Sequence, residues 1–256
     1  MKRFYFLLIV LFLAGCSSEI KEIEERIENR LAETNTNVSF FQLKRDAYYI
    51  YQWNKDETFR DEINEFKRLD NENFPEKGKI LFTGSSSIRF WDSLKKDMKP
   101  LKVLNRGFGG AHISHIIYHF DEIIKPYDPK AIVFFCGTND LTALKTPEET
   151  MNDFKRFYSL VRNEFGNIKI YIISIKPSID RLYLDKEERI FNNLMNLLSN
   201  EDPYLEYIDV WNSMLNKDGS RMPELFIEDG LHMNEKGYEI WTKLVRESLE
   251  KDFNLG

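Results

Sequence analysis

The sequence has little cysteine, no surplus of basic residues and only one notable apolar run, and each shortage excludes a class of protein. Its 256 residues include two cysteines. Cys16 directly follows an N-terminal leader, which leaves Cys136 without an intrachain partner, so a hydrophobic core must hold the fold instead of disulfides. The formal net charge of −6 argues against nucleic acid as a partner, because such proteins usually carry a basic face. With 42% hydrophobic residues, the chain can build one sizeable core.

The leader has the pattern of a secretory signal over residues 1–15. Lys2 and Arg3 precede the apolar run 4–13, which is too short for a membrane-spanning helix of about 20 residues. Its end, Leu13-Ala14-Gly15-Cys16, resembles the lipobox of bacterial lipoproteins. The resemblance implies that lipidated Cys16 anchors a soluble, extracytoplasmic domain to a bacterial membrane, the outer one in a Gram-negative cell. An ordinary cleaved signal and an uncleaved anchor are the alternatives.

Two helical segments are predicted before the main domain. Residues 16–36 are polar, with apolar residues at helical spacing: Ile20, Ile23, Ile27 and Leu31. They form either a helix docked on the body or an amphipathic tether between lipid and domain. Residues 37–77 form a helical extension, with a predicted buried stripe of Trp53, Phe59, Ile63 and Phe66. We expect this extension to brace the body, because its aromatic stripe is typical of a core-facing surface; a pocket wall is the alternative.

Residues 78–256 alternate short apolar runs with helical patterns. The predicted strands are 80–83, 102–105, 131–136, 168–175 and 205–210, and the predicted helices are 113–124, 148–165, 186–198 and 235–250. This alternation implies crossover connections and a parallel sheet. The predicted fold class is therefore α/β: a flavodoxin-like three-layer sandwich with a central five-stranded parallel sheet and helices on both faces. Cys136 follows an apolar run, so we interpret it as a buried small hydrophobe.

Polar clusters follow the first three strands and precede the last helix. They are Gly84-Ser85-Ser86-Ser87, Asn105-Arg106-Gly107-Phe108-Gly109-Gly110, Gly137-Thr138-Asn139-Asp140 and Asp229-Gly230-Leu231-His232. Ligands of parallel α/β sheets bind beyond the carboxyl ends of the strands, so we expect all four clusters at one edge. Taken alone, a Gly-Ser cluster after a strand is more commonly a turn and helix N-cap than a nucleophile. Together, the clusters supply a serine, a glycine-rich backbone, an amide, and a carboxylate near an imidazole.

These four blocks, in this order, resemble the SGNH hydrolases, the GDSL-like esterase and acylhydrolase superfamily. The resemblance covers the chain from about Trp53 to its C-terminus. Several segments resemble the GSSSI subgroup of that family: Phe82-Thr83-Gly84-Ser85-Ser86-Ser87-Ile88-Arg89-Phe90-Trp91, Asn105 to Gly110, Ile173-Ser174-Ile175-Lys176-Pro177-Ser178 and Arg221-Met222-Pro223-Glu224-Leu225-Phe226. The family usually has an aspartate where this chain has Ser85, a change that the subgroup shares. That aspartate takes no part in the triad, but its absence weakens any transfer of substrate preference from better-known GDSL lipases.

The resemblance implies a catalytic triad and an oxyanion hole. Ser86 would be the nucleophile, His232 the base and then the acid, and Asp229 the residue that orients the imidazole. The amides of Ser86 and Gly110 and the side chain of Asn139 would bind the oxyanion. No metal or other cofactor is needed for this chemistry.

Ser85 and Ser87 are rivals for the nucleophile, with Ser86 favoured by its position two residues after Gly84.

Other polar and aromatic residues have a functional and a structural interpretation. His112, His115 and His119 lie at helical spacing, where metal binding is possible but a polar face is more common. We expect His112 to lie at the pocket rim. Lys176 and Arg181 are either solvated surface charges, as is Arg106, or contacts to the substrate pocket or an anionic leaving group. Trp91 and Trp211 could stack on a sugar, although core packing is the better expectation.

The sequence therefore predicts a lipid-anchored serine esterase. The ester would be a carbohydrate O-acetyl group or a lysophospholipid-type acyl ester, and the partners are that substrate and a membrane. The alternative is a non-catalytic glycan- or lipid-binding lipoprotein on the same scaffold, since fold alone does not settle function. The acyl length, the membrane leaflet and the oligomeric state stay open.

Overall fold

The computed structural model describes residues 18–253 except 34, 36 and 56. Its centre is a five-stranded, all-parallel sheet of order β2-β1-β3-β4-β5. The strands are β1 (Ile80–Gly84), β2 (Val103–Gly107), β3 (Ala131–Phe135), β4 (Lys169–Ile173) and β5 (Leu205–Ile208). β1 and β3 are buried along their whole length, and all their residues are apolar except Thr83 and Gly84 of β1, as expected of central strands covered on both faces. The predicted fold class is confirmed.

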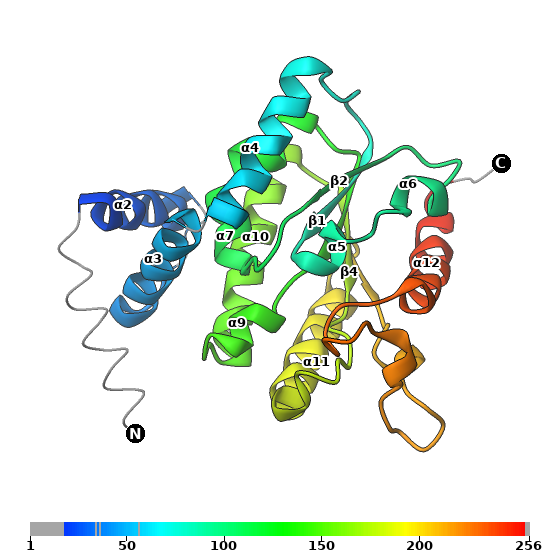
Figure 1. The fold of residues 1–256 in the computed structure, drawn as a ribbon. Helices are drawn as coiled ribbons and strands as arrows, with labels where there is room; N and C mark the ends of the chain where they lie inside the picture. The colour runs from blue at the N-terminus through cyan, green and yellow to red at the C-terminus, as the bar shows by residue number, and fades with distance from the viewer. Residues whose placement is uncertain (1–17, 34, 36, 56, 254–256) are drawn as a thin grey trace.

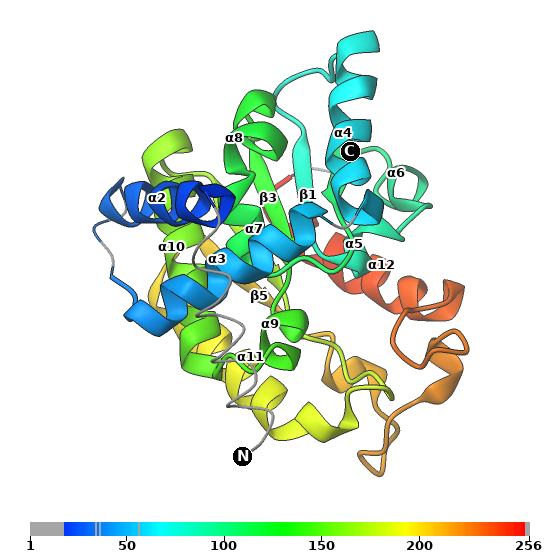
Figure 2. The ribbon, with the colours of Figure 1, turned by 60° about the vertical axis from the view of Figure 1, so that its left-hand side comes forward.

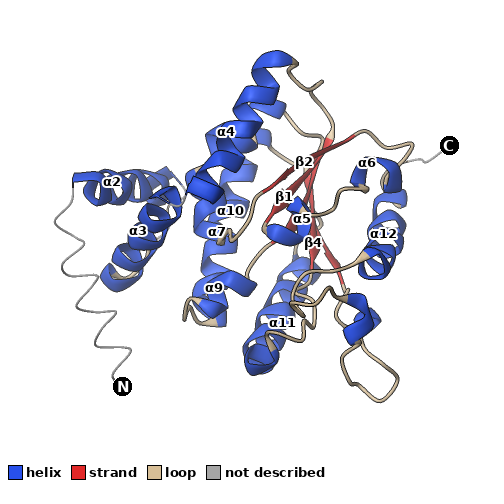
Figure 3. Cartoon of the chain, viewed as in Figure 1, coloured by secondary structure: helices blue, strands red, loops and turns tan. Residues whose placement is uncertain are grey.

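Helices cover both faces of the sheet: α7 (Ile113–Tyr118) and α10 (Pro147–Phe165) lie on one side, and α6 (Leu94–Asp97) and α12 (Glu235–Glu250) on the other (Figure 1). One core lies between the sheet and the layer that contains α7 (Ile113–Tyr118), α10 (Pro147–Phe165) and α11 (Asp185–Glu201). The opposite core lies beneath α5 (Ser86–Arg89), α6 (Leu94–Asp97) and α12 (Glu235–Glu250). Figure 3 shows the strands enclosed between these two helical layers. Trp91 and Trp211 are buried in these cores, which supports the packing interpretation.

Several predicted boundaries need correction. The single helix predicted over 113–124 is wrong: α7 ends at Tyr118, and α8 (Phe120–Ile123) starts after a break at His119. The helical extension predicted over 37–77 consists of two helices, α3 (Phe40–Lys55) and α4 (Glu57–Glu72). The strand predicted over 168–175 ends at Ile173, because the following residues leave the sheet to form the loop before α11.

The N-terminal helices dock on the body. The apolar stripe of α2 (Ser18–Glu33) is buried in a small core shared with α3, and Arg26 donates a hydrogen bond to the Tyr118 carbonyl at 2.7 Å. Figure 2 shows α3 in front of α7, against which it packs. Of the two alternatives for residues 16–36, the docked helix is observed over the part that the structure describes. Trp53 and Ile63 enter the main core with Phe66 against it, whereas the side chain of Phe59 is not described.

The leader lies outside the described residues, as does Cys16. No helix in the described part of the chain has the length and apolarity needed to cross a membrane.

Candidate active site

Ser86 stands where β1 turns sharply into α5. The turn needs Gly84, because its φ is 143° and a Cβ there would collide with the Phe135 carbonyl oxygen. Ser85 anchors the turn by donating its amide to the same carbonyl at 3.0 Å. Ser85 and Ser87 are buried, whereas Ser86 is half-buried at the sheet edge. Of the three serines, Ser86 is the one whose hydroxyl meets the histidine of the fourth cluster.

His232 links the serine to a carboxylate. Its Nε2 lies 3.0 Å from the Ser86 Oγ, and its Nδ1 lies 2.6 Å from the Asp229 Oδ2. The other oxygen of Asp229 accepts the backbone amides of Leu231 and His232 at 2.8 and 2.9 Å. Partial burial opposes ionisation, but the hydrogen bonds from His232 and from the two amides hold the pKa of Asp229 below its usual value. The geometry is that of a serine, a base and a carboxylate in one hydrogen-bonded line.

The loop between residues 226 and 234 presents this pair. A positive φ of 65° at Gly230 lets the chain reverse, and the Ile227 amide donates to the His232 carbonyl at 2.9 Å. Directly after the loop, Asn234 caps α12 by accepting the amides of Lys236 and Gly237. The short turn and the capped helix therefore set the position of the imidazole from both sides.

The second and third clusters meet beside the serine turn. Gly110 follows β2 with a φ of 62°, a conformation that suits glycine. The Asn139 side chain donates to the Ala111 carbonyl at 3.1 Å, so the amide lies against the Gly110 loop. Cys136 is buried and donates to the same carbonyl at 3.2 Å, and burial raises its thiol pKa, as expected for a structural cysteine. The oxyanion role of Gly110 and Asn139 stays a prediction.

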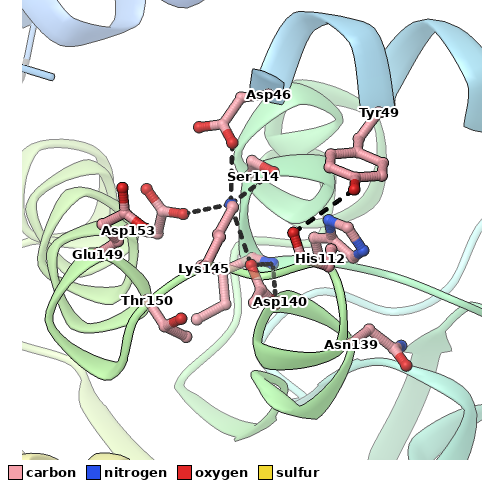
Figure 4. Close-up of polar contacts among 12 residues, drawn as sticks. Asp46, Tyr49, His112, Ser114, Asn139, Asp140, Lys145, Glu149, Thr150 and Asp153 are labelled. Atoms are coloured by element: carbon pink, nitrogen blue, oxygen red, sulfur yellow. Dashed lines mark hydrogen bonds and ion pairs between the residues drawn. The ribbon is translucent and has the colours of Figure 1, made fainter. Parts of the chain in front are cut away.

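A buried charge cluster supports this loop from behind (Figure 4). The Asp140 carboxylate accepts the Ile113 amide at the start of α7. The Lys145 ammonium lies 3.1 Å from Asp140, 2.6 Å from Asp153 and 3.1 Å from Asp46 of α3. Burial would lower the pKa of Lys145, but the three carboxylates outweigh it and raise that pKa. Asp46 and Lys145 carry no local sequence signal, because they meet only when α3 docks.

The three helix histidines form no exposed polar face, so that expectation is wrong. His112, His115 and His119 are all buried, because the N-terminal extension covers them. The His112 ring packs edge-on against Tyr49 at 5.2 Å, and Trp53 lies 5.3 Å from both other rings. Burial lowers the pKa of His112 to about 3. No cluster of potential metal ligands occurs among the described residues, and a rim position for His112 stays a prediction.

Lys176 is not a solvated surface charge. It is 3% exposed and donates to the Ser87 Oγ at 3.0 Å, directly beneath the serine turn. Burial lowers its pKa to about 8. Arg181 lies in the loop beside the histidine: it pairs with Asp180, whose amide donates to the Gly230 carbonyl. Contact of Lys176 or Arg181 with substrate stays a prediction.

Arg106 is buried as well, paired with Asp70 at 2.5 Å, and is therefore also no surface charge.

Known proteins resemble this chain in sequence and in fold. A family model described as the GDSL-like Lipase/Acylhydrolase family matches residues 82–240. The N-acylneuraminate cytidylyltransferase of Escherichia coli O18:K1:H7 is 24% identical over 229 residues, which are 88% of this chain and 50% of that protein. The chain therefore spans about half the length of this curated relative.

Solved structures share the fold. A Streptococcus pneumoniae protein described as a platelet activating factor has a TM-score of 0.66 and 21% identity, and the match covers 75% of this chain and 93% of that one. A GDSL-like lipase from Bacteroides thetaiotaomicron has a TM-score of 0.58 and 19% identity over 75% of this chain and 100% of that one. The acetyl xylan esterase AlAXEase has a TM-score of 0.57 and 17% identity over 67% and 99%.

Proposed function

The chain belongs to the GDSL-like lipase/acylhydrolase family, and from that premise we propose that it cleaves carboxylic esters through an acyl-enzyme at Ser86. One observation carries the proposal: the Ser86 hydroxyl is 3.0 Å from an imidazole that a carboxylate holds at 2.6 Å. A serine hydroxyl is a poor nucleophile until a neighbouring base takes its proton. His232 is placed to be that base, with its other nitrogen directed to Asp229.

The proposed reaction has two halves. In the first, the Ser86 oxygen bonds to the ester carbonyl carbon while its proton passes to His232, and the carbonyl oxygen becomes the oxyanion. Donors from Ser86, Gly110 and Asn139 stabilise that charge, after which the leaving alcohol takes the proton from His232. In the second half, a water attacks the acyl-enzyme by the same route and releases the carboxylic acid.

We propose a carbohydrate O-acetyl ester as the substrate. One structural neighbour supports this choice by name, since it is an acetyl xylan esterase. The curated relative, a cytidylyltransferase matched over half of its length, is also named for a carbohydrate, N-acylneuraminate. A lysophospholipid-type ester is the second candidate, which the neighbour described as a platelet activating factor favours.

We also propose that Cys16 carries the lipid that anchors the protein outside the cytoplasm. Support comes from the leader and from α2, which starts at Ser18 and is docked on α3. So short a link would hold the domain close to the membrane surface. Metabolic labelling with a radioactive fatty acid tests this: the wild type incorporates label and Cys16→Ala does not. Equal labelling of the two would exclude Cys16 as the lipidated residue.

A substrate panel tests the esterase proposal. Acetylated xylo-oligosaccharides, a 4-nitrophenyl acetate and decanoate pair, and a lysophospholipid are compared for wild type and Ser86→Ala. We expect fastest release from the acetyl esters and loss of activity in Ser86→Ala. Ser85→Ala, which removes the neighbouring buried hydroxyl, is the matched control and should retain turnover. Activity that survives Ser86→Ala would exclude the acyl-enzyme, and binding without cleavage would favour the non-catalytic module.

A further inference from the structure

The backbone of Gly109 is held by two side chains that lie outside the family-matched residues 82–240. The Glu62 Oε2 of α4 accepts the Gly109 amide at 2.6 Å. The indole Nε1 of Trp53, in α3, donates to the Gly109 carbonyl at 3.2 Å. The N-terminal extension therefore holds both polar groups of the residue directly before Gly110.

The same carboxylate also reaches the helix that carries the serine. The second oxygen of Glu62 forms an ion pair at 2.9 Å with Arg89, which ends α5 three residues after Ser86. The Glu62 side chain is 12% exposed and that of Arg89 is 36% exposed, so solvent screens this pair less than a fully exposed pair. One half-buried carboxylate thus joins the Gly109–Gly110 turn to the serine helix.

The turn needs such external support. Glycines carry no side chain that could pack or hydrogen-bond, and without a Cβ they populate positive and negative φ about equally, so nothing intrinsic to Gly110 holds it at its φ of 62°. Donors for an oxyanion work only when they already point at the place where charge develops, so a mobile turn would forfeit their effect. A fixed distance between the Gly110 amide and the Ser86 oxygen requires a link between their two segments.

We infer that Glu62 is a positioning residue, which sets the Gly110 amide relative to Ser86 by bridging Gly109 and Arg89. The inference rests on the proposed esterase function. Trp53 supports the same turn through the Gly109 carbonyl, which belongs to the same peptide unit as the Gly110 amide. The N-terminal extension is on this account part of the active-site framework as well as a structural brace.

Three variants test this in the full chain. Glu62→Ala removes the bridge, and Glu62→Gln keeps an acceptor for the Gly109 amide but loses the charge that pairs with Arg89. Glu65→Gln is the matched control, since it lies on the same helix and its carboxylate pairs with Arg68 at the surface. The readouts are kcat and KM for an acetyl ester, and the affinity of phenylboronic acid, whose tetrahedral adduct on Ser86 mimics the oxyanion state. All are measured well below each variant's melting temperature.

We expect Glu62→Ala to lower kcat by about 10- to 100-fold with KM changed less than about twofold. Misplaced oxyanion donors weaken binding of the transition state, whereas binding of the substrate is little affected. Phenylboronic acid affinity should fall in parallel. Glu62→Gln should lose less, and Glu65→Gln should match the wild type. Equal kcat in Glu62→Ala and Glu65→Gln would overturn the inference, as would a fall in kcat without any loss of phenylboronic acid affinity.

Amide hydrogen exchange gives a readout that needs no activity. Residues 107–111 should exchange faster in Glu62→Ala than in the wild type and in Glu65→Gln, because the Gly109 amide has lost its acceptor. Unchanged exchange would contradict the bridge even if no ester were cleaved. Ser86-dependent activity that is insensitive to Glu62 would refute this inference alone, whereas absence of any Ser86-dependent activity would refute the proposed function.

Discussion

Asp229→Asn tests the link between the carboxylate and the imidazole with little change of shape. The Oδ1 of Asp229 accepts two backbone amides, and the Asn oxygen can keep both bonds. The Oδ2 lies 2.6 Å from the His232 Nδ1, and there the variant must present an NH₂ group. A donor facing Nδ1 favours the tautomer with its proton on Nε2. That nitrogen could then no longer accept the Ser86 proton.

The exposure of Asp229 sets the size of the expected loss in kcat. For a buried carboxylate in a serine triad, this exchange lowers kcat by about 10⁴. The Asp229 side chain is 42% exposed, so water can partly replace its effect. We therefore expect a fall of about 10²–10³ in kcat, equivalent to about 3–4 kcal/mol in the barrier, with KM little changed.

The assay is steady-state hydrolysis of 4-nitrophenyl acetate across pH 6–9, with Asp218→Asn as the control. Asp218 is an exposed turn residue that accepts hydrogen bonds from Ser220, and its variant should match the wild type. A loss of less than about threefold in Asp229→Asn would refute the proposed role of the carboxylate.

Three further predictions concern the surroundings of the site. Lys145→Met should destabilise the protein by about 3–5 kcal/mol in urea unfolding, since it removes the cation that the buried Asp46, Asp140 and Asp153 carboxylates share, and Arg156 pairs with only two of them, Asp46 and Asp153; unchanged stability would contradict this. Wild-type stability should rise relative to Lys176→Met between about pH 8 and 10.5, because the unfolded lysine there binds a proton that the folded one lacks; parallel pH curves would refute it. Gly110→Ala should lower the free energy of unfolding by about 1–2 kcal/mol, because alanine is strained at a φ of 62°, and it should also lower kcat; a variant as active and as stable as the wild type would contradict this.

The sheet and the four polar clusters could be predicted from the sequence. Central strands such as Ala131–Phe135 are buried on both faces and therefore read as continuous apolar runs. Parallel strands place their carboxyl ends at one edge, so the polar clusters were expected to meet there, and Ser86 and His232 do meet, with 3.0 Å between Oγ and Nε2. Three-residue spacing between Asp229 and His232 corresponds to the short turn that closes their 2.6 Å contact.

The contacts made by the N-terminal extension could not be predicted. Glu62 and Trp53 meet Gly109 from positions 47 and 56 residues away, and no periodicity encodes such a separation. The helix histidines have the spacing of a polar face, yet docking of α3 buries them against aromatic rings. Lysine is usually a surface charge, and only the path of the β4–α11 loop brings Lys176 to donate a hydrogen bond to the Ser87 Oγ. Tertiary contact decided each of these environments.

Covalent labelling of the serine tests the central proposal most directly. The protein is treated with a fluorophosphonate, digested, and the modified peptide is sequenced by mass spectrometry. A single adduct on Ser86, formed quickly in the wild type and slowly in Asp229→Asn, is the predicted result. No adduct, or an adduct on Ser85 or Ser87 instead, would contradict the proposed nucleophile.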